Sequence, residues 1–319
     1  MVQRILVVLV VGALLWSCAP GPGRVVVPNA VPRTRPITLR VQVKEGNALV
    51  VRVVALEDYV AATAASEVHP EAGDEEIAER MYEVQAVIAR TYAMTNRGRH
   101  ARDGFDLCST THCQLYEPAR LATSRWAAAA RAAAQKTTGE ILWFADAPAR
   151  VVFHADCGGY TSAASAVWGG IAPAYLAGQP DNCQTGNAHG EWTFDARTDA
   201  LRAALNADPR TAVGIRLDNV EIAGRDAAGR AEKIVLRGSR TFVIRGEIFR
   251  DVVTRRLGVK TLRSTLFSVK KVRGVFSFSG KGFGHGVGLC QAGALARLKG
   301  GDSPEQVLLH YFPGISLRR

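Results

Sequence analysis

Residues 56–70 read LEDYVAATAASEVHP, and this stretch predicts a helix that carries one carboxylic acid on its inner face. An α-helix turns by about 100° per residue, so positions 56, 60, 63 and 67 share one face. Leu56, Val60 and Thr63 make that face mostly apolar and direct it toward a core. Glu67 therefore lies on the buried stripe of the helix.

The end of this helix is predicted close to Glu67, because Pro70 disfavours helical backbone at His69. The negative end of the helix dipole and partial burial both disfavour a carboxylate anion, so both raise the pKa of Glu67. A carboxyl group that stays protonated near neutral pH suits a general acid. The alternative is a last-turn Glu that remains solvated and has no catalytic part.

The segments around this helix mix strands and helices without a regular alternation. Residues 37–43 and 48–55 have the pattern of two strands joined by a turn at Gly46-Asn47. A long helix is expected at 74–95. Residues 140–144 and 150–154 are expected to form a strand pair around Asp146-Ala147-Pro148. Further elements are expected at 119–136, 247–257, 276–278, 291–299 and 303–311. This order favours an α+β fold in a single irregular domain, residues 37–317, with 214–271 as a basic subdomain.

The composition is that of a globular protein with a basic surface. The 319 residues include 40 Lys and Arg against 29 Asp and Glu, which gives a net charge of +11. Such a charge favours an anionic partner. No phosphate-binding loop and no zinc-finger spacing is present, and aromatic residues make up only 7%. We therefore expect no nucleic-acid partner.

The first residues predict export and a lipid anchor. Residues 1–17 contain a twelve-residue apolar run from Ile5 to Trp16, which is short for a membrane span and typical of a signal peptide. Ser17-Cys18 follows it as in a bacterial lipobox, so Cys18 is the expected lipidation site. The alternative is an ordinary secreted or signal-anchored protein. Residues 18–36 hold five prolines and predict an extended tether.

Arg90 occupies an unusual place on the second predicted helix. Ala86, Ile88, Ala89 and Ala93 around it are typical of a protein core. A guanidinium in this setting either pairs with a carboxylate or reaches a binding cleft. Both interpretations stay open at this point.

A group of metal-type ligands follows the second helix. Cys108, His112 and Cys113 lie within six residues, and His100 lies upstream. Cysteine and histidine side chains are the usual zinc ligands. In an exported protein, a disulfide between Cys108 and Cys113 is the alternative.

Three more cysteines lie further along the chain. Cys157 precedes Gly158-Gly159, Cys183 lies in the next long loop, and Cys290 lies near the last helices. The simplest pairing is a Cys157–Cys183 disulfide with Cys290 left as a free thiol.

The segment 280–294 reads GKGFGHGVGLCQAGA and surrounds His285 with glycines. Glycine allows a ligand to approach the backbone closely. A lone histidine is usually structural, but this one precedes a predicted helix and is a candidate binding residue. We expect this segment and the Glu67 helix to line a cleft.

Taken together, six ordered segments resemble the SpoIID/LytB family of bacterial cell-wall proteins. They cover roughly residues 37–317 and end with His310-Tyr311-Phe312-Pro313-Gly314. The matching stretches are 56–68, 85–93, 105–116, 138–142, 154–168 and 282–294.

The resemblance implies a role for particular residues. Glu67 matches the family's catalytic glutamate, Arg90 its Ala-Arg-Thr arginine and His285 its Gly-His-Gly histidine. Residues expected to bind substrate are Arg90, Gln85, His285, Gln291 and Tyr311. Some family members bind zinc near a similar cluster, which implies a structural zinc ion at Cys108, His112 and Cys113, with His100 or Arg102 at the position of a further ligand.

The resemblance also implies a lytic transglycosylase that cleaves peptidoglycan glycan strands without stem peptides. Its single Glu67 acts as acid and then base, and no cofactor is required for this chemistry. An ordinary glycosidase needs a second carboxylate, for which Asp58, Asp106 and Asp156 are the candidates. The alternatives are a glycan-binding amidase enhancer and a zinc-dependent peptidoglycan hydrolase. The expected setting is the cell envelope, with glycan strands, the membrane and an amidase as partners.

Overall fold

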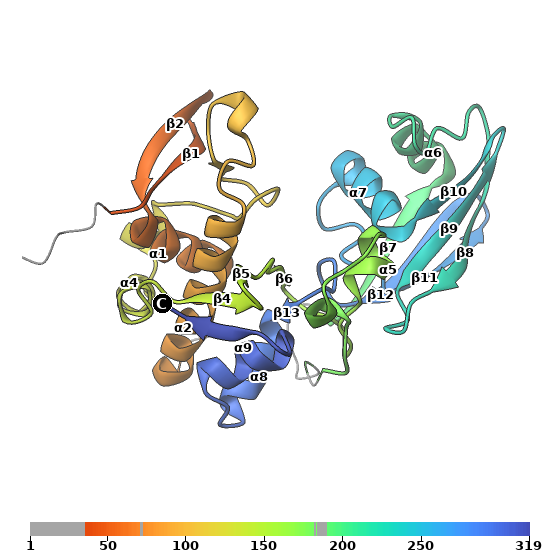
Figure 1. Ribbon diagram of the computed structural model, residues 1–319. Helices are drawn as coiled ribbons and strands as arrows, with labels where there is room; N and C mark the ends of the chain where they lie inside the picture. Colours follow the sequence, from red (N-terminus) through yellow and green to blue (C-terminus); the bar gives the residue numbers. More distant parts are fainter. Residues whose placement is uncertain (1–35, 71–72, 182, 184–189) are drawn as a thin grey trace, which may run out of the picture. The chain divides into compact units, whose positions relative to one another are not determined.

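The computed structural model describes residues 36–70, 73–181, 183 and 190–319 (Figure 1). The predicted signal peptide, Cys18 and all of the tether except Pro36 lie outside the described residues. Within the described part of the chain, no helix combines the length and apolar character that crossing a membrane requires.

A β-hairpin begins the described chain, as the sequence predicts. β1 (Thr38–Glu45) and β2 (Ala48–Ala55) pair antiparallel along their full lengths. Gly46 forms the turn with a φ of 59°, which glycine adopts without strain. A two-residue strand, β3 (Leu107–Cys108), adds to β1 in parallel.

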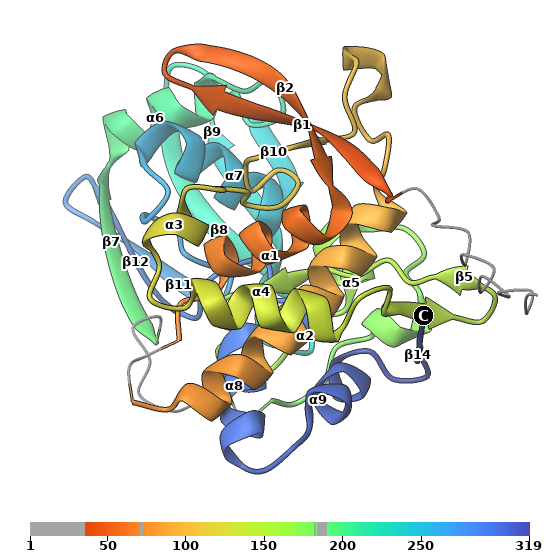
Figure 2. The ribbon, with the colours of Figure 1, turned by 90° about the vertical axis from the view of Figure 1, so that its left-hand side faces the viewer.

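Four helices pack together beside this hairpin (Figure 2). α1 (Leu56–Glu67) is short and almost wholly buried, which its many alanines permit. α2 (Glu75–Thr95) begins at Asp74, whose side chain accepts a hydrogen bond from the backbone N–H of Ile77. The helix expected at 119–136 is two helices, α3 (Arg120–Thr123) and α4 (Ala127–Lys136), because Ser124 between them is extended.

One predicted strand pairing is wrong. The strand β4 (Ile141–Phe144) pairs with β5 (Ala147–Pro148) and with the C-terminal β14 (Ser316–Arg318), and not with residues 150–154. Past Pro148 this pairing continues only to a hydrogen bond from the Ala149 N–H to the Leu142 carbonyl oxygen, at 2.7 Å. β6 (Phe153–His154) instead runs parallel to β13 (Leu289–Cys290), far along the sequence.

Two C-terminal helices pack against α2. They are α8 (Gln291–Lys299) and α9 (Pro304–Tyr311), and both agree with the predicted bounds to within a residue. Ser303 begins α9 with a capping box that it forms with Gln306. Three short elements, α5 (Ala164–Trp168) and the 3₁₀ turns Ala101–Asp103 and Ala174–Leu176, complete this part of the chain.

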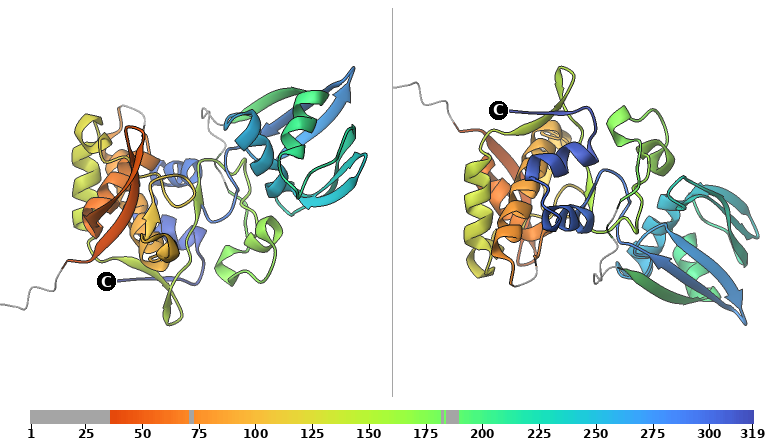
Figure 3. Two further views of the ribbon diagram at one scale, coloured as in Figure 1. Left: turned by 90° about the horizontal axis from the view of Figure 1, so that it is seen from above. Right: turned by 90° about the horizontal axis from the view of Figure 1, so that it is seen from below.

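The middle of the chain has two three-stranded antiparallel sheets and two helices, which Figure 3 shows from above and below. One sheet has the order β11-β12-β7 and the other the order β10-β9-β8. The elements are β7 (Glu191–Arg197), α6 (Thr198–Asn206), β8 (Leu217–Arg225), β9 (Ala231–Gly238), β10 (Thr241–Arg245), α7 (Gly246–Leu257), β11 (Phe267–Val272) and β12 (Val275–Lys281).

These elements confirm the α+β prediction, and residues 37–319 form one compact unit. Two separate hydrophobic cores lie inside it. The larger core takes residues from 39–183 and 287–315, and the smaller one takes residues from 192–278. The basic segment 214–271 lies within the span of the smaller core.

Candidate active site

Glu67 is the last residue of α1, where the sequence predicts it. Val68 after it is extended, with φ −120° and ψ 132°, so the helix stops there. The Glu67 side chain is half-buried, and its Oε1 accepts a hydrogen bond of 2.6 Å from the backbone N–H of Leu115. The carboxyl group is thus fixed by a loop that lies 48 residues further along the chain.

The surroundings keep this acid protonated near neutral pH. The pKa of Glu67 is raised to about 7: burial is the largest cause and the negative charge of Glu117 adds to it, while the hydrogen bond from Leu115 partly offsets the rise. A pKa near the working pH suits a group that gives and then takes a proton.

The residues beside Glu67 come from the loop that precedes α3. The backbone N–H of Glu117 donates to Ser66 Oγ at 3.0 Å, which ties this loop to the end of α1. The Glu117 carboxylate pairs with Arg120, and Arg120 also contacts His69. Sequence reasoning missed Leu115, Glu117 and Arg120, because nothing in a loop sequence indicates which distant helix end it will meet.

Two of the predicted substrate-binding residues, Gln85 and Gln291, contact each other, and Gln291 also reaches the backbone of Glu67. Gln291 Nε2 is 3.3 Å from the Glu67 carbonyl oxygen and 3.3 Å from Gln85 Oε1. Gln85 is fully buried, and Gln291 is half-buried. The end of the glycine-rich segment therefore reaches the Glu67 helix, while the predicted cleft between them stays a prediction.

The structure corrects the role predicted for Arg90. Its side chain is only 1% exposed, and its guanidinium pairs with Glu57, with Nε–Oε1 at 3.0 Å. Further hydrogen bonds go to Thr137 Oγ1 and to the carbonyl oxygens of Ala134 and Glu140. Arg90 is thus a structural link between α1, α2 and the end of α4, which was the alternative interpretation of the sequence.

Tyr311 is also placed differently from the prediction. The residue is 3% exposed, and its hydroxyl donates to the Asp181 carboxylate at 2.9 Å. This buried pair fixes α9 against the loop at 181, and the Tyr311 hydroxyl is not presented to a substrate.

His285 is half-buried and lies in a group of aromatic side chains. Its ring centroid is 5.4 Å from that of His154 and 5.1 Å from that of Trp168. Its Nδ1 accepts a hydrogen bond from the backbone N–H of Val287 at 3.0 Å. Burial lowers the pKa of His285 to about 3, with help from the charges of Arg250 and Arg230, so the ring is neutral. A substrate contact of His285 stays a prediction.

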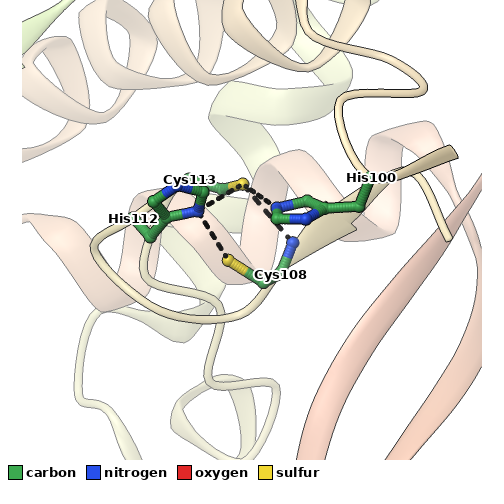
Figure 4. A group of neighbouring side chains, drawn as sticks. All are labelled: His100, Cys108, His112 and Cys113. Carbon is green, nitrogen blue, oxygen red and sulfur yellow. Dashed lines mark hydrogen bonds between the residues drawn. The ribbon is translucent and has the colours of Figure 1, made fainter. Parts of the chain in front are cut away.

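The four predicted metal ligands converge on one point (Figure 4). One ligand atom from each of His100, Cys108, His112 and Cys113 lies within 4.8 Å of the others. Cys113 Sγ is 3.4 Å from His100 Nε2, and Cys108 Sγ is 3.6 Å from His112 Nδ1. The tight turn 110–113 allows the adjacent residues His112 and Cys113 to face the same point.

This donor set fits a zinc ion. Two sulfurs and two imidazole nitrogens are a usual tetrahedral set for structural zinc. Burial and the charges of Arg99 and His100 lower the pKa of His112, which favours the neutral ring that a metal requires. Four protein ligands leave no open position for a substrate or a water.

The Cys157–Cys183 disulfide is not present in the structure. Both residues are free thiols, although their sulfurs are only 2.9 Å apart, so the predicted proximity is correct. Cys290 belongs to the same group, which the sequence did not indicate, because Cys290 reaches it through the β6–β13 pairing.

Comparison with known proteins identifies two segments of the chain. Residues 44–144 match the family model SpoIID, described as stage II sporulation protein. Residues 182–288 match a domain of unknown function, DUF8618.

The similarity to individual proteins covers more of the chain than the match to either family model. An uncharacterized protein of Brachyspira hyodysenteriae is 29% identical over 275 residues, which cover 84% of this chain and 68% of that protein. Stage II sporulation protein D of Bacillus amyloliquefaciens is 26% identical over 277 residues, or 83% of this chain and 74% of that protein.

The amidase enhancer of Bacillus subtilis is 26% identical over 276 residues. The match covers 73% of this chain but only 37% of that protein, so most of the longer relative has no counterpart here. Glu67, the metal-ligand cluster and the helices α1 to α4 all lie inside residues 44–144, so the part of the chain that carries the candidate site is similar to the SpoIID family.

Proposed function

We propose that this protein is a lytic transglycosylase of the cell envelope, which cleaves peptidoglycan glycan strands that lack stem peptides. The observation that carries the proposal is the half-buried Glu67 carboxyl group, whose pKa is raised to about 7 at the end of α1. The similarity to the SpoIID family suggests the substrate class.

The chemistry needs one carboxyl group in two roles. Glu67 donates its proton to the glycosidic oxygen as the bond from that oxygen to C1 of N-acetylmuramic acid breaks. The Glu67 carboxylate then accepts the proton of the C6 hydroxyl of the same sugar, and the C6 oxygen bonds to C1. Glu67 is protonated again, the product is a 1,6-anhydro sugar, and no water is consumed.

The carboxylates near Glu67 fit this scheme better than a hydrolysis with two carboxylates. Of the three candidates for a second carboxylate, Asp106 forms a salt bridge with Arg40 at 3.2 Å. Asp156 belongs to the cysteine group, and Asp58 is exposed on α1. The negative charge of Glu117 does act on the pKa of Glu67, but the Glu117 carboxylate is paired with Arg120.

We further propose a structural zinc ion at His100, Cys108, His112 and Cys113. The ion would hold the loop that continues to Leu115, whose N–H binds Glu67. A closed set of four ligands argues against the zinc-dependent hydrolase.

The test uses purified glycan strands and the variant Glu67→Gln, which keeps the shape of the side chain but cannot donate the proton. We expect cleavage to fall by about 10²–10⁴-fold while glycan binding persists. Glu79→Gln makes the same chemical change at an exposed site on α2 and should leave cleavage unchanged. Mass spectrometry should find anhydro products, each one water lighter than a hydrolysis product.

The other outcomes separate the alternatives. Reducing-end products would exclude a transglycosylase but keep Glu67 as an acid. Full cleavage by Glu67→Gln would remove Glu67 from the mechanism. Tight glycan binding without cleavage by the native protein would favour the second candidate, a non-catalytic partner of an amidase. That candidate is supported by the similarity to the amidase enhancer.

A further inference from the structure

A second group of metal-type ligands lies apart from the His100–Cys113 cluster. It consists of Asp156, Cys157, Cys183 and Cys290, and one ligand atom from each lies within 4.8 Å of the others. All four residues are buried, and the three thiols are 0–3% exposed. Three sulfurs and a carboxylate therefore share one small, dry volume.

Backbone N–H groups point at all three sulfurs. Cys290 Sγ accepts from the N–H of Cys157 at 3.2 Å and from that of Gly293 at 3.3 Å. Cys183 Sγ accepts from the N–H of Gly159 at 3.0 Å, and the same N–H lies 3.3 Å from Cys157 Sγ. N–H donors aimed at sulfur stabilise the thiolate more than the thiol, as they do around metal-bound cysteines.

Carboxylate oxygens lie next to two of the three sulfurs. Cys183 Sγ is 3.3 Å from Asp156 Oδ1, and Cys157 Sγ is 3.2 Å from Asp181 Oδ2. Thiolates and carboxylates together are donor types that a divalent transition-metal ion binds. Arg230 is also buried, and its guanidinium binds the Cys157 carbonyl oxygen at 2.7 Å.

We propose that Cys157, Cys183, Cys290 and Asp156 form a second zinc site. Three thiolates and one carboxylate suit a borderline-soft divalent ion in tetrahedral geometry. With Zn–S bonds of about 2.3 Å, neighbouring sulfurs lie about 3.8 Å apart. The sulfurs of Cys157 and Cys183, now 2.9 Å apart, must separate by about 1 Å when the ion binds.

This site would fix the segment that carries Gln291. Cys290 ends β13 and is followed directly by Gln291, which contacts Glu67 and Gln85. Asp181 connects the same group to Tyr311 on α9. A metal here would join the β6 loop, the loop at 183 and the start of α8, and so would hold Gln291 in place.

The first experiment counts metal in the full-length protein after equilibration with Zn²⁺ and removal of the excess. Elemental analysis of four proteins separates the two sites. We expect two zinc ions in the native chain, one in Cys183→Ser, one in Cys108→Ser/Cys113→Ser and none in the triple variant. An equal zinc content in the native chain and in Cys183→Ser would overturn the proposal.

A second measurement does not depend on altering the new site. In the Cys108→Ser/Cys113→Ser protein, bound Co²⁺ should give thiolate-to-metal absorption in the near ultraviolet, since the first cluster has lost its sulfurs. Absence of that absorption would contradict the proposal. So would a peptide map without reductant in which two of Cys157, Cys183 and Cys290 are joined by a disulfide.

Discussion

Gln291 Nε2 lies 3.3 Å from the carbonyl oxygen of Glu67, although 224 residues separate the two in the chain. The same amide group lies 3.3 Å from the side-chain oxygen of Gln85. This contact joins the start of α8 to the end of the helix that carries the candidate acid. It couples the C-terminal part of the chain to the proposed catalytic group through the backbone and not through the carboxylate.

Replacing Gln291 with Ala should therefore lower both stability and cleavage. Gln85 is fully buried, so its oxygen would lose its partner at a cost of about 1–3 kcal/mol. Urea unfolding and glycan cleavage measure the two effects. Gln306→Ala is a control for stability, because Gln306 contributes only to the cap of α9. Unchanged stability and cleavage in Gln291→Ala would mean that the contact has no energetic weight.

Glu67 should make the stability of the protein depend on pH. Its pKa is about 7 in the folded protein and about 4.5 in the unfolded chain, so the folded state holds the proton more tightly. The resulting stability is fully present below pH 4.5 and is lost as pH rises through 7, by up to about 3 kcal/mol. Glu67→Gln should lack this loss. If the free energy of unfolding changes with pH in the same way in both proteins, the pKa of Glu67 is not raised in the folded state.

Cleavage should follow the same ionisation, because only protonated Glu67 can act as the acid. We expect kcat/KM to fall as pH rises above about 7. Rates measured from pH 5 to 9 on glycan strands test this. A rate that rises steadily over that range would show that Glu67 works as a base from the start.

Because Arg90 pairs with Glu57, we expect that replacing Arg90 lowers the stability of the fold and leaves glycan binding unchanged. Replacing Arg90 with Met leaves Glu57 and three further hydrogen-bond acceptors without their partner. Glu57 is 34% exposed, so we expect a loss of about 2–3 kcal/mol, less than for a fully buried pair. Normal stability with a raised KM for glycan would restore the substrate role predicted from sequence.

Removal of the zinc ion proposed for the His100–Cys113 cluster should loosen the loop that holds Glu67. Chelation should increase hydrogen exchange at residues 100–117 and lower cleavage, because Leu115 follows Cys113 by two residues. His112→Ala should reproduce both effects without a chelator. If exchange in this loop is unchanged when the metal is gone, the ion does not support the site.

The lipid anchor is tested separately, since Cys18 lies outside the described residues. Cys18→Ser should abolish processing and release the protein from the membrane fraction. Fractionation and the mass of the N-terminal peptide measure this. Unchanged membrane association would leave an ordinary signal anchor as the explanation.

The parts of the fold that the sequence predicts are those with local causes. The β1–β2 hairpin, α1, α2 and the last two helices follow from short-range periodicity, and Pro70 fixes the end of α1. The partners of β4 and β6 could not be predicted in this way, because β13 and β14 lie more than a hundred residues away.

The same difference between local and long-range contacts decides which parts of the candidate site could be predicted. Glu67 is placed by its own helix, and His112 and Cys113 by their own turn. Leu115, Glu117 and the three-sulfur group depend on contacts between distant segments. The apolar residues around Arg90 are compatible both with a structural salt bridge and with a binding role. Only the position of Glu57 in the folded chain decides in favour of the salt bridge.

The smaller core has one consequence for the evolution and engineering of this chain. Its strands begin at Glu191 and end at Lys281, and the N–H of Gly282 donates to the Gly190 carbonyl oxygen at 3.0 Å. The two ends of this segment are therefore adjacent, as in an insertion that a parent fold can accept or lose. A short turn from Gly190 to Gly282 would shorten the chain by about ninety residues without stretching it. The segment that such a turn would remove lies wholly within the part of the chain that matches DUF8618.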